Sequence, residues 1–367
     1  MGNWLSLYGC CPPDVQTEDH EEVLESVGRA HLPVHELTDF RYHAAMGGHL
    51  DILTPKEGVA ILALRQGRLV RVSGAVVLKA SSGNERRFYE ALGARAARGE
   101  RGERRLGSLA PGFYGAAAVR SEEKAQEYLV LEKVGDFRHP LAFDLKLGFV
   151  QRAAHHGPGK RFHMRRKAAE TTSAEFGFRH CGMAYWDWTH MTKVKEDKYQ
   201  GRQVTGRQLL GVLGRFFNQS PDQAWPLQGP WRSIVDKALA EVEILRGLIG
   251  KVEGLRFWGA SLLLVLDGDA VAKQNPEKIV SSFSVKLIDF SNSEFIGDGP
   301  DRELLAALRN FSAALAALAA LRGGGGGPPP VGPAPDLRPQ DAEQLQAHKS
   351  RGLPYTLQDV SPDDCSK

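Results

Sequence analysis

The stretch His139–Val150 reads His-Pro-Leu-Ala-Phe-Asp-Leu-Lys-Leu-Gly-Phe-Val and sets an acid and a base two residues apart in an apolar run. In an extended strand, residues two apart point to the same face, so Asp144 and Lys146 would share one side. Pro140 cannot donate a ladder hydrogen bond and marks the strand entrance, while Gly148 lets the chain turn or approach a ligand. An isolated Asp-x-Lys is more often a surface ion pair. The longer spacing P-x-x-x-D-x-K-x-G is therefore what indicates a site.

Length and composition describe a globular chain with room for one large or two small domains. The protein has 367 residues, a mass of 40.2 kDa, 42% hydrophobic and 25% charged residues, and a formal net charge of +3. So small a net charge does not favour nucleic-acid binding. No run of about eighteen apolar residues occurs, so we expect no membrane-spanning helix. The few cysteines form no C-x-x-C pair or zinc-spaced set, which fits a reducing, cytoplasmic compartment: Cys10, Cys11, Cys181 and Cys365.

The N-terminus carries a short lipidation pattern. It reads Met-Gly-Asn-Trp-Leu-Ser, so Gly2 and Ser6 match the N-myristoylation motif, and Cys10 and Cys11 are close enough to accept palmitate. An ordinary flexible start is the alternative. We expect residues 1–40 to be a tether with lipidation at Gly2, Cys10 and Cys11, and hence association of a cytoplasmic protein with a membrane, with the nucleus as a further location.

Several separated motifs give the chain its family resemblance. The spacing P-x-x-x-D-x-K-x-G resembles the signature of the inositol polyphosphate kinases. It is accompanied by a strand ending Val-Leu-Lys, a K-Y-x-G-R-like turn at 198–202, an S-L-L strand and an I-D-F motif at 288–290. Each motif alone is weak, but their order is that of the family. The resemblance covers roughly residues 41–321 and implies that Asp144 and Lys146 are the catalytic acid and lysine.

A strand-rich span at Val59–Lys79 is followed by a predicted helix at Asn84–Leu92. Kinases hold the phosphates of ATP with a strand lysine that pairs with a helix glutamate. Lys79 is thus the candidate phosphate lysine and Glu85 its candidate partner. A strand-end lysine and a solvated glutamate remain the alternative from these residues alone.

The resemblance implies further cofactor contacts. Glu132 and Val134 match the hinge positions whose backbone binds adenine, although Lys133 stands where the family often has Asp or Asn. The stretch Ala260-Ser-Leu-Leu resembles the S-S-L-L strand of the family. Ala260 replaces the first serine of that motif, and Ser261 is the second. Asp289, at the end of a buried-looking strand, matches the ligand of the ATP-bound metal, and Mg²⁺ prefers such hard oxygen ligands.

A basic segment follows the central strand. A phosphorylated substrate needs several cationic donors, because each phosphate carries more than one negative charge. A solvated helix face is the alternative. The position soon after Asp144 and Lys146 favours substrate binding by Lys160, Arg161, Arg165, Arg166 and Lys167.

The fold implied is α+β and two-lobed, like the inositol polyphosphate kinases and related to protein kinases and ATP-grasp enzymes. We expect a tether at 1–40, a small β-rich ATP-binding lobe and hinge at 41–134, a larger lobe with the inositol phosphate and metal sites at 135–322, and a Gly/Pro-rich linker and disordered tail at 323–367. The protein is expected to be a monomer.

The implied function is transfer of the γ-phosphoryl group of ATP, with Mg²⁺, to an inositol polyphosphate. Residues 162–183 look most like the hexakisphosphate kinases, which make pyrophosphates, and the multikinase branch is the alternative. The sequence lacks the G-x-G-x-x-G, H-R-D and D-F-G motifs of protein kinases. A degenerate kinase that only binds inositol phosphates is a further alternative, which the retained Lys79, Asp144, Lys146 and Asp289 disfavour.

Overall fold

The computed structural model describes residues 22–26, 32–44, 51–81, 83–98, 106–121, 124–152, 156–217 and 230–320. These residues group into two compact units. Unit 1 contains the described parts of Met1–His43, Ile52–Ala80 and Phe113–Lys133. Unit 2 contains those of Ala44–Asp51, Ser81–Gly112 and the chain from Val134 onward. Unit 2 thus resumes at Val134, next to the boundary expected at 134/135, and the described part of residues 81–112, which was expected in the ATP-binding lobe, groups with unit 2.

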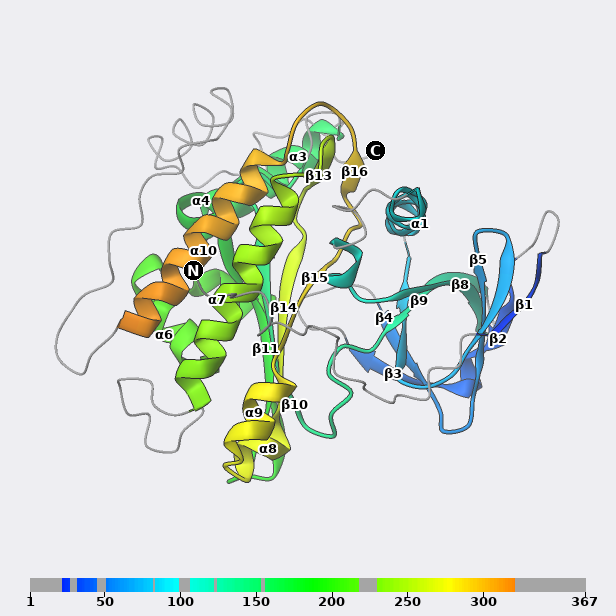
Figure 1. Ribbon diagram of the computed structural model, residues 1–367, viewed down its shortest axis with the longest axis horizontal. Helices are drawn as coiled ribbons and strands as arrows, with labels where there is room; N and C mark the ends of the chain where they lie inside the picture. The colour runs from blue at the N-terminus through cyan, green and yellow to red at the C-terminus, as the bar shows by residue number, and fades with distance from the viewer. Residues whose placement is uncertain are drawn as a thin grey trace, which may run out of the picture. The chain divides into compact units, whose positions relative to one another are not determined.

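Unit 1 is built around one sheet, in which the strands follow the order β1-β6-β5-β8-β9-β7-β4-β3 and β2 pairs with β8 (Figure 1). Apolar residues alternate along the strands, as in β7, where Val76, Leu78 and Ala80 are buried. Lys79 lies between them and points to the other face. The strands are β1 (Glu22–Ser26), β2 (Val34–Glu36), β3 (Phe40–Ala44), β4 (Asp51–Pro55), β5 (Ile61–Arg65), β6 (Arg68–Val72), β7 (Val76–Ala80), β8 (Phe113–Arg120) and β9 (Ala125–Glu132).

The predicted tether at 1–40 extends too far. Residues Glu22–Ser26 pair with β6, Val34–Glu36 pair in parallel with β8, and a 3-10 turn covers Leu37–Asp39. Backbone pairing is decided by neighbouring strands, which a polar and acidic local composition does not reveal.

Helix α1 (Asn84–Ala97) begins where the sequence predicts and continues beyond Leu92, the expected end. Its buried face carries Phe88, whose ring stacks on Phe290 at 4.7 Å and on Phe295 at 5.4 Å between centroids. These aromatic contacts explain why α1 belongs to unit 2.

The central sheet of unit 2 is antiparallel, with the order β12-β11-β10-β14-β15. Its middle strand is β10, the stretch that opened the sequence analysis. The strands are β10 (Pro140–Leu147), β11 (Phe178–Asp187), β12 (Thr192–Glu196), β14 (Ser261–Asp267) and β15 (Ser284–Ile288), while β13 (Leu255–Phe257) and β16 (Ser293–Phe295) form a separate pair.

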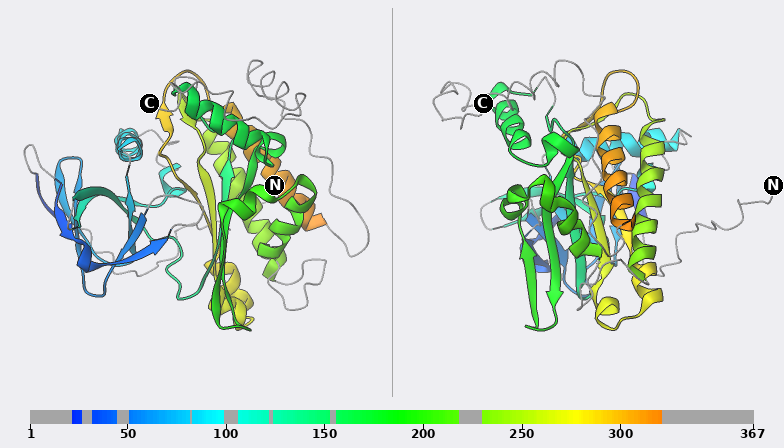
Figure 2. Two further views of the ribbon diagram at one scale, coloured as in Figure 1. Left: turned by 180° about the vertical axis from the view of Figure 1, so that it is seen from behind. Right: turned by 90° about the vertical axis from the view of Figure 1, so that its left-hand side faces the viewer.

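Helices cover one face of this sheet. The long helices α7 and α10 lie side by side in Figure 1 and in the turned views of Figure 2. The apolar faces of α6 and α7 are buried in the core of unit 2. The helices are α3 (Pro158–Ala169), α4 (Ser173–Phe176), α5 (Lys198–Gln203), α6 (Gly206–Phe217), α7 (Pro230–Ile249), α8 (Gly268–Ala272), α9 (Pro276–Ser282) and α10 (Arg302–Ala320).

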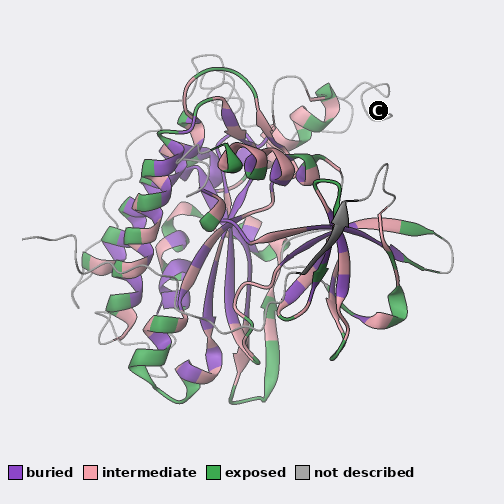
Figure 3. Ribbon diagram, turned by 45° about the vertical axis from the view of Figure 1, so that its right-hand side comes forward, coloured by how far each residue is buried: buried purple, intermediate pink, exposed green. Residues whose placement is uncertain are grey.

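Strand β10 separates the core of unit 2 from its polar face. Phe143, Leu145 and Leu147 are buried, and the Phe143 ring lies 5.5 Å from that of Phe216 in α6. Asp144 and Lys146 alternate with them and therefore lie on the opposite face. Figure 3 shows the almost continuous burial of the central strands.

Among the described residues, α10 alone is long and apolar enough to cross a membrane. Most of its apolar side chains are buried against unit 2, including Leu308, Phe311 and Leu315, which is the pattern of a core helix. The mixed architecture, a sheet-rich first unit and a helix-covered sheet in the second, confirms the expected α+β class.

Candidate active site

Four neighbouring strands bring one row of residues together on the polar face of the unit 2 sheet. Lys146 in β10 lies opposite Arg179 of β11 on one side and Ser261 of β14 on the other. Ser261 in turn lies opposite Ile288, the last residue of β15. Directly opposed residues of antiparallel strands share a face. Asp289 follows Ile288 directly and leaves the extended conformation, with a φ of +67°, and its side chain reaches Lys146.

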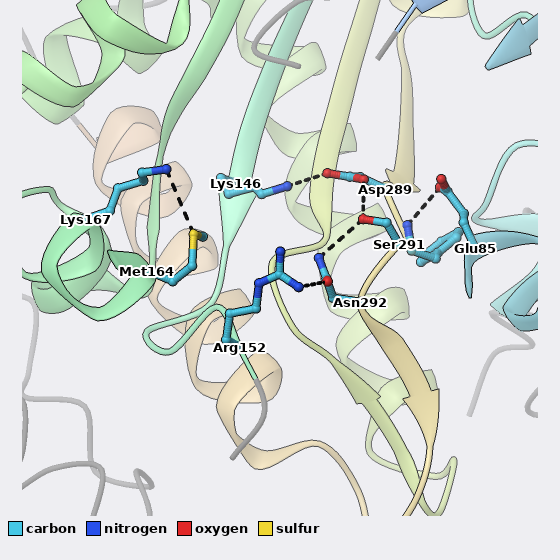
Figure 4. Close-up of polar contacts among 9 residues, drawn as sticks. Glu85, Lys146, Arg152, Met164, Lys167, Asp289, Ser291 and Asn292 are labelled. Atoms are coloured by element: carbon cyan, nitrogen blue, oxygen red, sulfur yellow. Dashed lines mark hydrogen bonds and ion pairs between the residues drawn. The ribbon is translucent and has the colours of Figure 1, made fainter. Parts of the chain in front are cut away.

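Lys146 and Asp289 form an ion pair in which the lysine Nζ donates to Oδ2 of the carboxylate. Figure 4 shows that this pair is one end of a polar chain. The Ser291 hydroxyl donates to Asp289 Oδ1 at 3.2 Å, Asn292 Nδ2 donates to Ser291 Oγ at 3.3 Å, and Arg152 donates to Asn292 Oδ1. Burial lowers the pKa of Lys146, but the attraction of the acidic groups around it, Asp289 foremost and Asp144 among them, together outweighs burial, and the pKa is raised overall. Lys146 is thus a fixed positive charge.

Asp144 is the buried acid of the site. Burial raises its pKa from 3.8 to about 6, against the opposing attraction of Lys146 and a hydrogen bond from Ser261. Its Oδ1 atom is buried and has no hydrogen-bond partner among the described residues. The carboxyl is therefore ionised at neutral pH, with one acceptor atom available.

A bulge in β11 lies beside Asp144. The register shifts so that Asp144 opposes Gly182 and Leu145 opposes His180, which leaves Cys181 as the extra residue. Bulges near active sites redirect side chains. Burial raises the pKa of the Cys181 thiol to about 12, so this thiol stays protonated.

Four cationic side chains converge next to this row and form what we call the basic cluster: Lys167, Arg179, Lys198 and Arg202. Burial and repulsion from the other three lower the pKa of Lys167 to about 8. The only hydrogen-bonding contact shown for its Nζ is with the Met164 sulfur, at 3.9 Å, and the buried Nε of Arg202 has no partner among the described residues. Arg179 donates to the Ser173 hydroxyl at 3.0 Å. Like charges this close, with so few acidic partners, indicate a site for a multiply charged anion.

The position of α5 explains how Lys198 and Arg202 come to lie in the basic cluster. Asp197 caps the helix by accepting from the backbone N–H groups of Tyr199 and Gln200, and the Gln200 side chain completes a capping box. Gly201 lies against β11, where a Cβ atom would be 2.3 Å from the carbonyl oxygen of His180. A glycine between Lys198 and Arg202 is therefore a steric requirement of this close approach.

The predicted catalytic and cofactor residues lie in both units. Lys79 (β7) and Glu132 (β9) belong to unit 1, on adjacent strands, where Lys79 opposes Leu129 and Glu132 opposes Val76. Glu132 shares a face of the sheet with Val76, its partner on β7, and Val76 and Lys79 are three residues apart. The side chains of Lys79 and Glu132 therefore point to opposite faces of the sheet. Val134 begins the third segment of unit 2. Glu85 is buried in α1, and its Oε1 accepts from the Phe290 N–H at 2.9 Å.

Of the five predicted substrate residues, all on α3, Lys167 reaches the basic cluster. Lys160 lies seven residues earlier, hence on the same side of the helix, and is exposed. Arg166 pairs with Glu170 at 3.5 Å, and Arg161 and Arg165 are partly exposed. The predicted lipidation sites Gly2, Cys10 and Cys11 lie outside the described residues.

Sequence reasoning missed Arg179, Lys198 and Arg202 as site residues, although the motifs that contain them were visible. Arg179 lies within residues 162–183, the stretch that resembles the hexakisphosphate kinases, and Lys198 and Arg202 are the first and last residues of the K-Y-x-G-R-like turn. Local sequence could not show that the strand and the turn converge on α3.

The oxygen donors near Asp289 fit a metal that is held jointly with phosphates. Among the described residues, no group of three or more His, Cys, Asp or Glu side chains could hold a metal ion alone. Asp289 supplies one carboxylate, with the Ser291 hydroxyl and Asn292 amide beside it. Mg²⁺ typically uses one or two carboxylates plus substrate phosphates, so this donor set suits a nucleotide-bound ion.

A carboxylate–lysine row beside a cluster of cationic side chains is an arrangement that suits phosphorylated anions. The family model described as inositol polyphosphate kinase matches residues 128–316, just over half of the chain. The chain belongs to the inositol polyphosphate kinase family.

Individual relatives agree with this assignment. The chain is 32% identical over 167 residues to inositol hexakisphosphate kinase 1 of Saccharomyces cerevisiae, covering 45% of this chain and 15% of that protein. It is 26% identical over 214 residues to human inositol hexakisphosphate kinase 3, covering 52% of this chain and 50% of that protein. The chain thus spans half or less of the length of these relatives. A solved structure of the inositol phosphate multikinase Ipk2 from S. cerevisiae, in complex with ADP and Mn²⁺, matches this chain with a TM-score of 0.55 at 23% identity. The match covers 66% of this chain and 98% of that one, and it confirms the kinase fold.

Proposed function

We propose that this protein transfers the γ-phosphoryl group of ATP to an inositol polyphosphate. The observation that carries the proposal is the basic cluster beside the row of Asp144, Lys146 and Asp289. The cluster provides cationic donors with few acidic partners for several phosphates, and the row provides the groups that phosphoryl transfer requires. Positioning and charge neutralisation account for most of the catalysis in such reactions.

Each group has a distinct role in this proposal. The substrate phosphates lie against Lys167, Arg179, Lys198 and Arg202. Lys146 stabilises the negative charge of the transferring or substrate phosphate. Asp144, ionised above pH 6, uses its free Oδ1 atom to orient the substrate hydroxyl or a ribose hydroxyl.

The nucleotide and metal contacts extend the proposal. Lys79 binds the ATP phosphates, and the backbone near Glu132 and Val134 holds the adenine. Asp289, with the neighbouring Ser291 and Asn292 oxygens, holds a divalent ion, for which we propose Mg²⁺; a bound ion supplies neutralisation of the charge on the nucleotide phosphates. The Ipk2 structure with ADP and Mn²⁺ supports a nucleotide and a divalent metal in this fold.

The test is to incubate the purified protein with ATP, Mg²⁺ and a panel of inositol phosphates, and to separate the products by chromatography. We expect a phosphorylated product from wild type and none from Asp289→Asn, in which an amide keeps the shape but loses the charge. Normal turnover by Asp289→Asn would remove this residue from the metal site.

Within the family, we propose the hexakisphosphate kinase branch, which the matched relatives favour. Inositol hexakisphosphate should then give a pyrophosphate product. Conversion of only less phosphorylated inositols would instead identify a multikinase. Binding of inositol phosphates, measured by calorimetry, without turnover of any of them would identify a binding module.

A lipid anchor at the N-terminus remains a separate proposal, motivated by Gly2 with Ser6 and by Cys10 and Cys11. One myristoyl chain binds membranes marginally, whereas two lipids bind stably. Gly2→Ala should move the protein to the soluble fraction of its native cells. An unmodified N-terminus in mass spectrometry of the native protein would contradict the proposal.

A further inference from the structure

A buried hydrogen bond connects helix α1 to the chain directly after Asp289. The Glu85 side chain is 1% exposed, and its Oε1 accepts from the Phe290 N–H at 2.9 Å. A carboxylate acceptor makes this bond stronger than one between neutral groups. Both residues belong to unit 2, so the bond lies within one compact body. Figure 4 shows Glu85 reaching this backbone next to the polar chain of Lys146 and Asp289.

The backbone at Asp289 needs such a restraint. Its φ is +67°, a left-handed conformation that L-residues other than glycine adopt only where the surrounding structure holds them. The Phe290 nitrogen and the Asp289 carbonyl share one rigid peptide plane. A bond that fixes the Phe290 N–H therefore fixes the orientation of this plane, and with it the direction in which Asp289 presents its carboxylate.

Ring packing holds the same residue from the same helix. Phe290 is buried, with its ring stacked on that of Phe88 at 4.7 Å and edge-on to that of Tyr89 at 5.2 Å. Glu85, Phe88 and Tyr89 form part of the buried face of α1. Helix α1 therefore contacts both the backbone N–H and the ring of Phe290.

We infer that Glu85 is a positioning residue that orients Asp289 toward its divalent ion through the Phe290 N–H. This inference rests on the proposed role of Asp289 as the metal ligand. The sequence predicts a different role for Glu85, an ion pair with Lys79. The two roles require different properties of the Glu85 side chain. Positioning requires an oxygen acceptor, which glutamine also has, whereas an ion pair requires the negative charge.

The experiment compares Glu85→Gln with Glu85→Ala. Mn²⁺ affinity is measured by electron paramagnetic resonance in the presence of ADP, and ADP affinity is measured separately in EDTA. Glu85→Ala should weaken Mn²⁺ binding about tenfold, as expected for one lost hydrogen bond, with metal-free ADP affinity unchanged. Glu85→Gln should stay within about threefold of wild type. Glu90→Ala, on the same helix and paired with Arg86, is the matched control and should change neither affinity.

Hydrogen exchange gives a second readout that does not depend on the ion. The Phe290 amide should exchange faster in Glu85→Ala and normally in Glu85→Gln. If Glu85→Ala fails to fold, Glu85→Asp takes its place, since it keeps the charge but shortens the side chain and draws the acceptor away from the Phe290 N–H. Glu85→Asp should then weaken Mn²⁺ binding and leave metal-free ADP affinity unchanged; unchanged Mn²⁺ affinity would overturn the inference.

Two results overturn the inference in the first comparison. Equal loss in Glu85→Gln and Glu85→Ala would show that the charge matters, and unchanged Mn²⁺ affinity in Glu85→Ala would show that the bond positions nothing. Failure of the proposed metal site gives a different result, because Asp289→Asn would then keep its Mn²⁺ affinity. Loss in Asp289→Asn together with normal binding in Glu85→Ala would retain the metal site and reject Glu85 alone.

Discussion

Replacement of Asp144 by asparagine should stabilise the protein while it abolishes turnover. The pKa of this buried carboxyl rises from 3.8 to about 6, so ionisation is less favourable in the folded than in the unfolded protein. At about 1.36 kcal/mol per pKa unit, ionised Asp144 costs about 3 kcal/mol of folding free energy at neutral pH. Asparagine avoids this cost but must bury an amide NH₂ facing Lys146 and Arg179. We therefore expect a net gain of about 1–3 kcal/mol.

The pH dependence makes this prediction specific. Above pH 6 the folded carboxyl is ionised and the cost is fully present. Between pH 6 and 3.8 the folded state binds the proton more tightly than the unfolded state, so the wild type recovers stability as the pH falls. The ionisation cost in the wild type therefore falls from about 3 to about 1 kcal/mol at pH 4.5, so the stability of Asp144→Asn relative to wild type should fall by about 2 kcal/mol between pH 7.5 and pH 4.5.

Urea denaturation at pH 7.5 and pH 4.5 measures this difference, and activity is assayed at pH 7.5. Glu277→Gln is the control, because Glu277 is exposed in the first turn of α9, and its stability should match wild type at both pH values. A stability difference for Asp144→Asn that is the same at both pH values would refute the reasoning. So would a variant that is less stable than wild type at pH 7.5.

Three further predictions concern the site. The affinity for inositol hexakisphosphate, measured by calorimetry from pH 7 to 9.5, should fall above pH 8 as Lys167 loses its proton; Lys167→Arg should flatten the profile, and an unchanged profile in that variant would exclude Lys167. Gly201→Ala should lower the free energy of unfolding by about 1–3 kcal/mol and weaken substrate binding, because the added Cβ meets the His180 carbonyl. Gly247→Ala, with open space in α7, should be neutral or slightly stabilising. Equal behaviour of the two variants in thermal denaturation would count against this explanation. Lys146→Ala should lower kcat by at least about 100-fold while ADP affinity changes little, and the reverse pattern in kinetics and calorimetry would contradict its assignment to the reacting phosphate.

The sequence alone determined the elements whose signal is local. Alternation in residues 139–150 predicted that Asp144 and Lys146 share a face, and β10 has that geometry, because the side-chain period of a strand is fixed by its backbone. The buried stripes of α6 and α7 were visible for the same reason, with the period of a helix. The ordered motifs also indicated the family, which the family model confirmed.

The tertiary structure decided what depends on contacts between distant segments. The basic cluster combines residues of α3, β11 and α5. Its shape depends on the bulge at Cys181, which arises when β11 pairs with β10, and on the close approach of Gly201, which arises when α5 packs on β11. Likewise, α1 follows the strands of unit 1 in the chain but packs on Phe290 in unit 2, and Glu85 bonds there to a backbone N–H. A backbone partner about 200 residues away leaves no mark on side-chain identity, so its position is set by packing and not by local sequence.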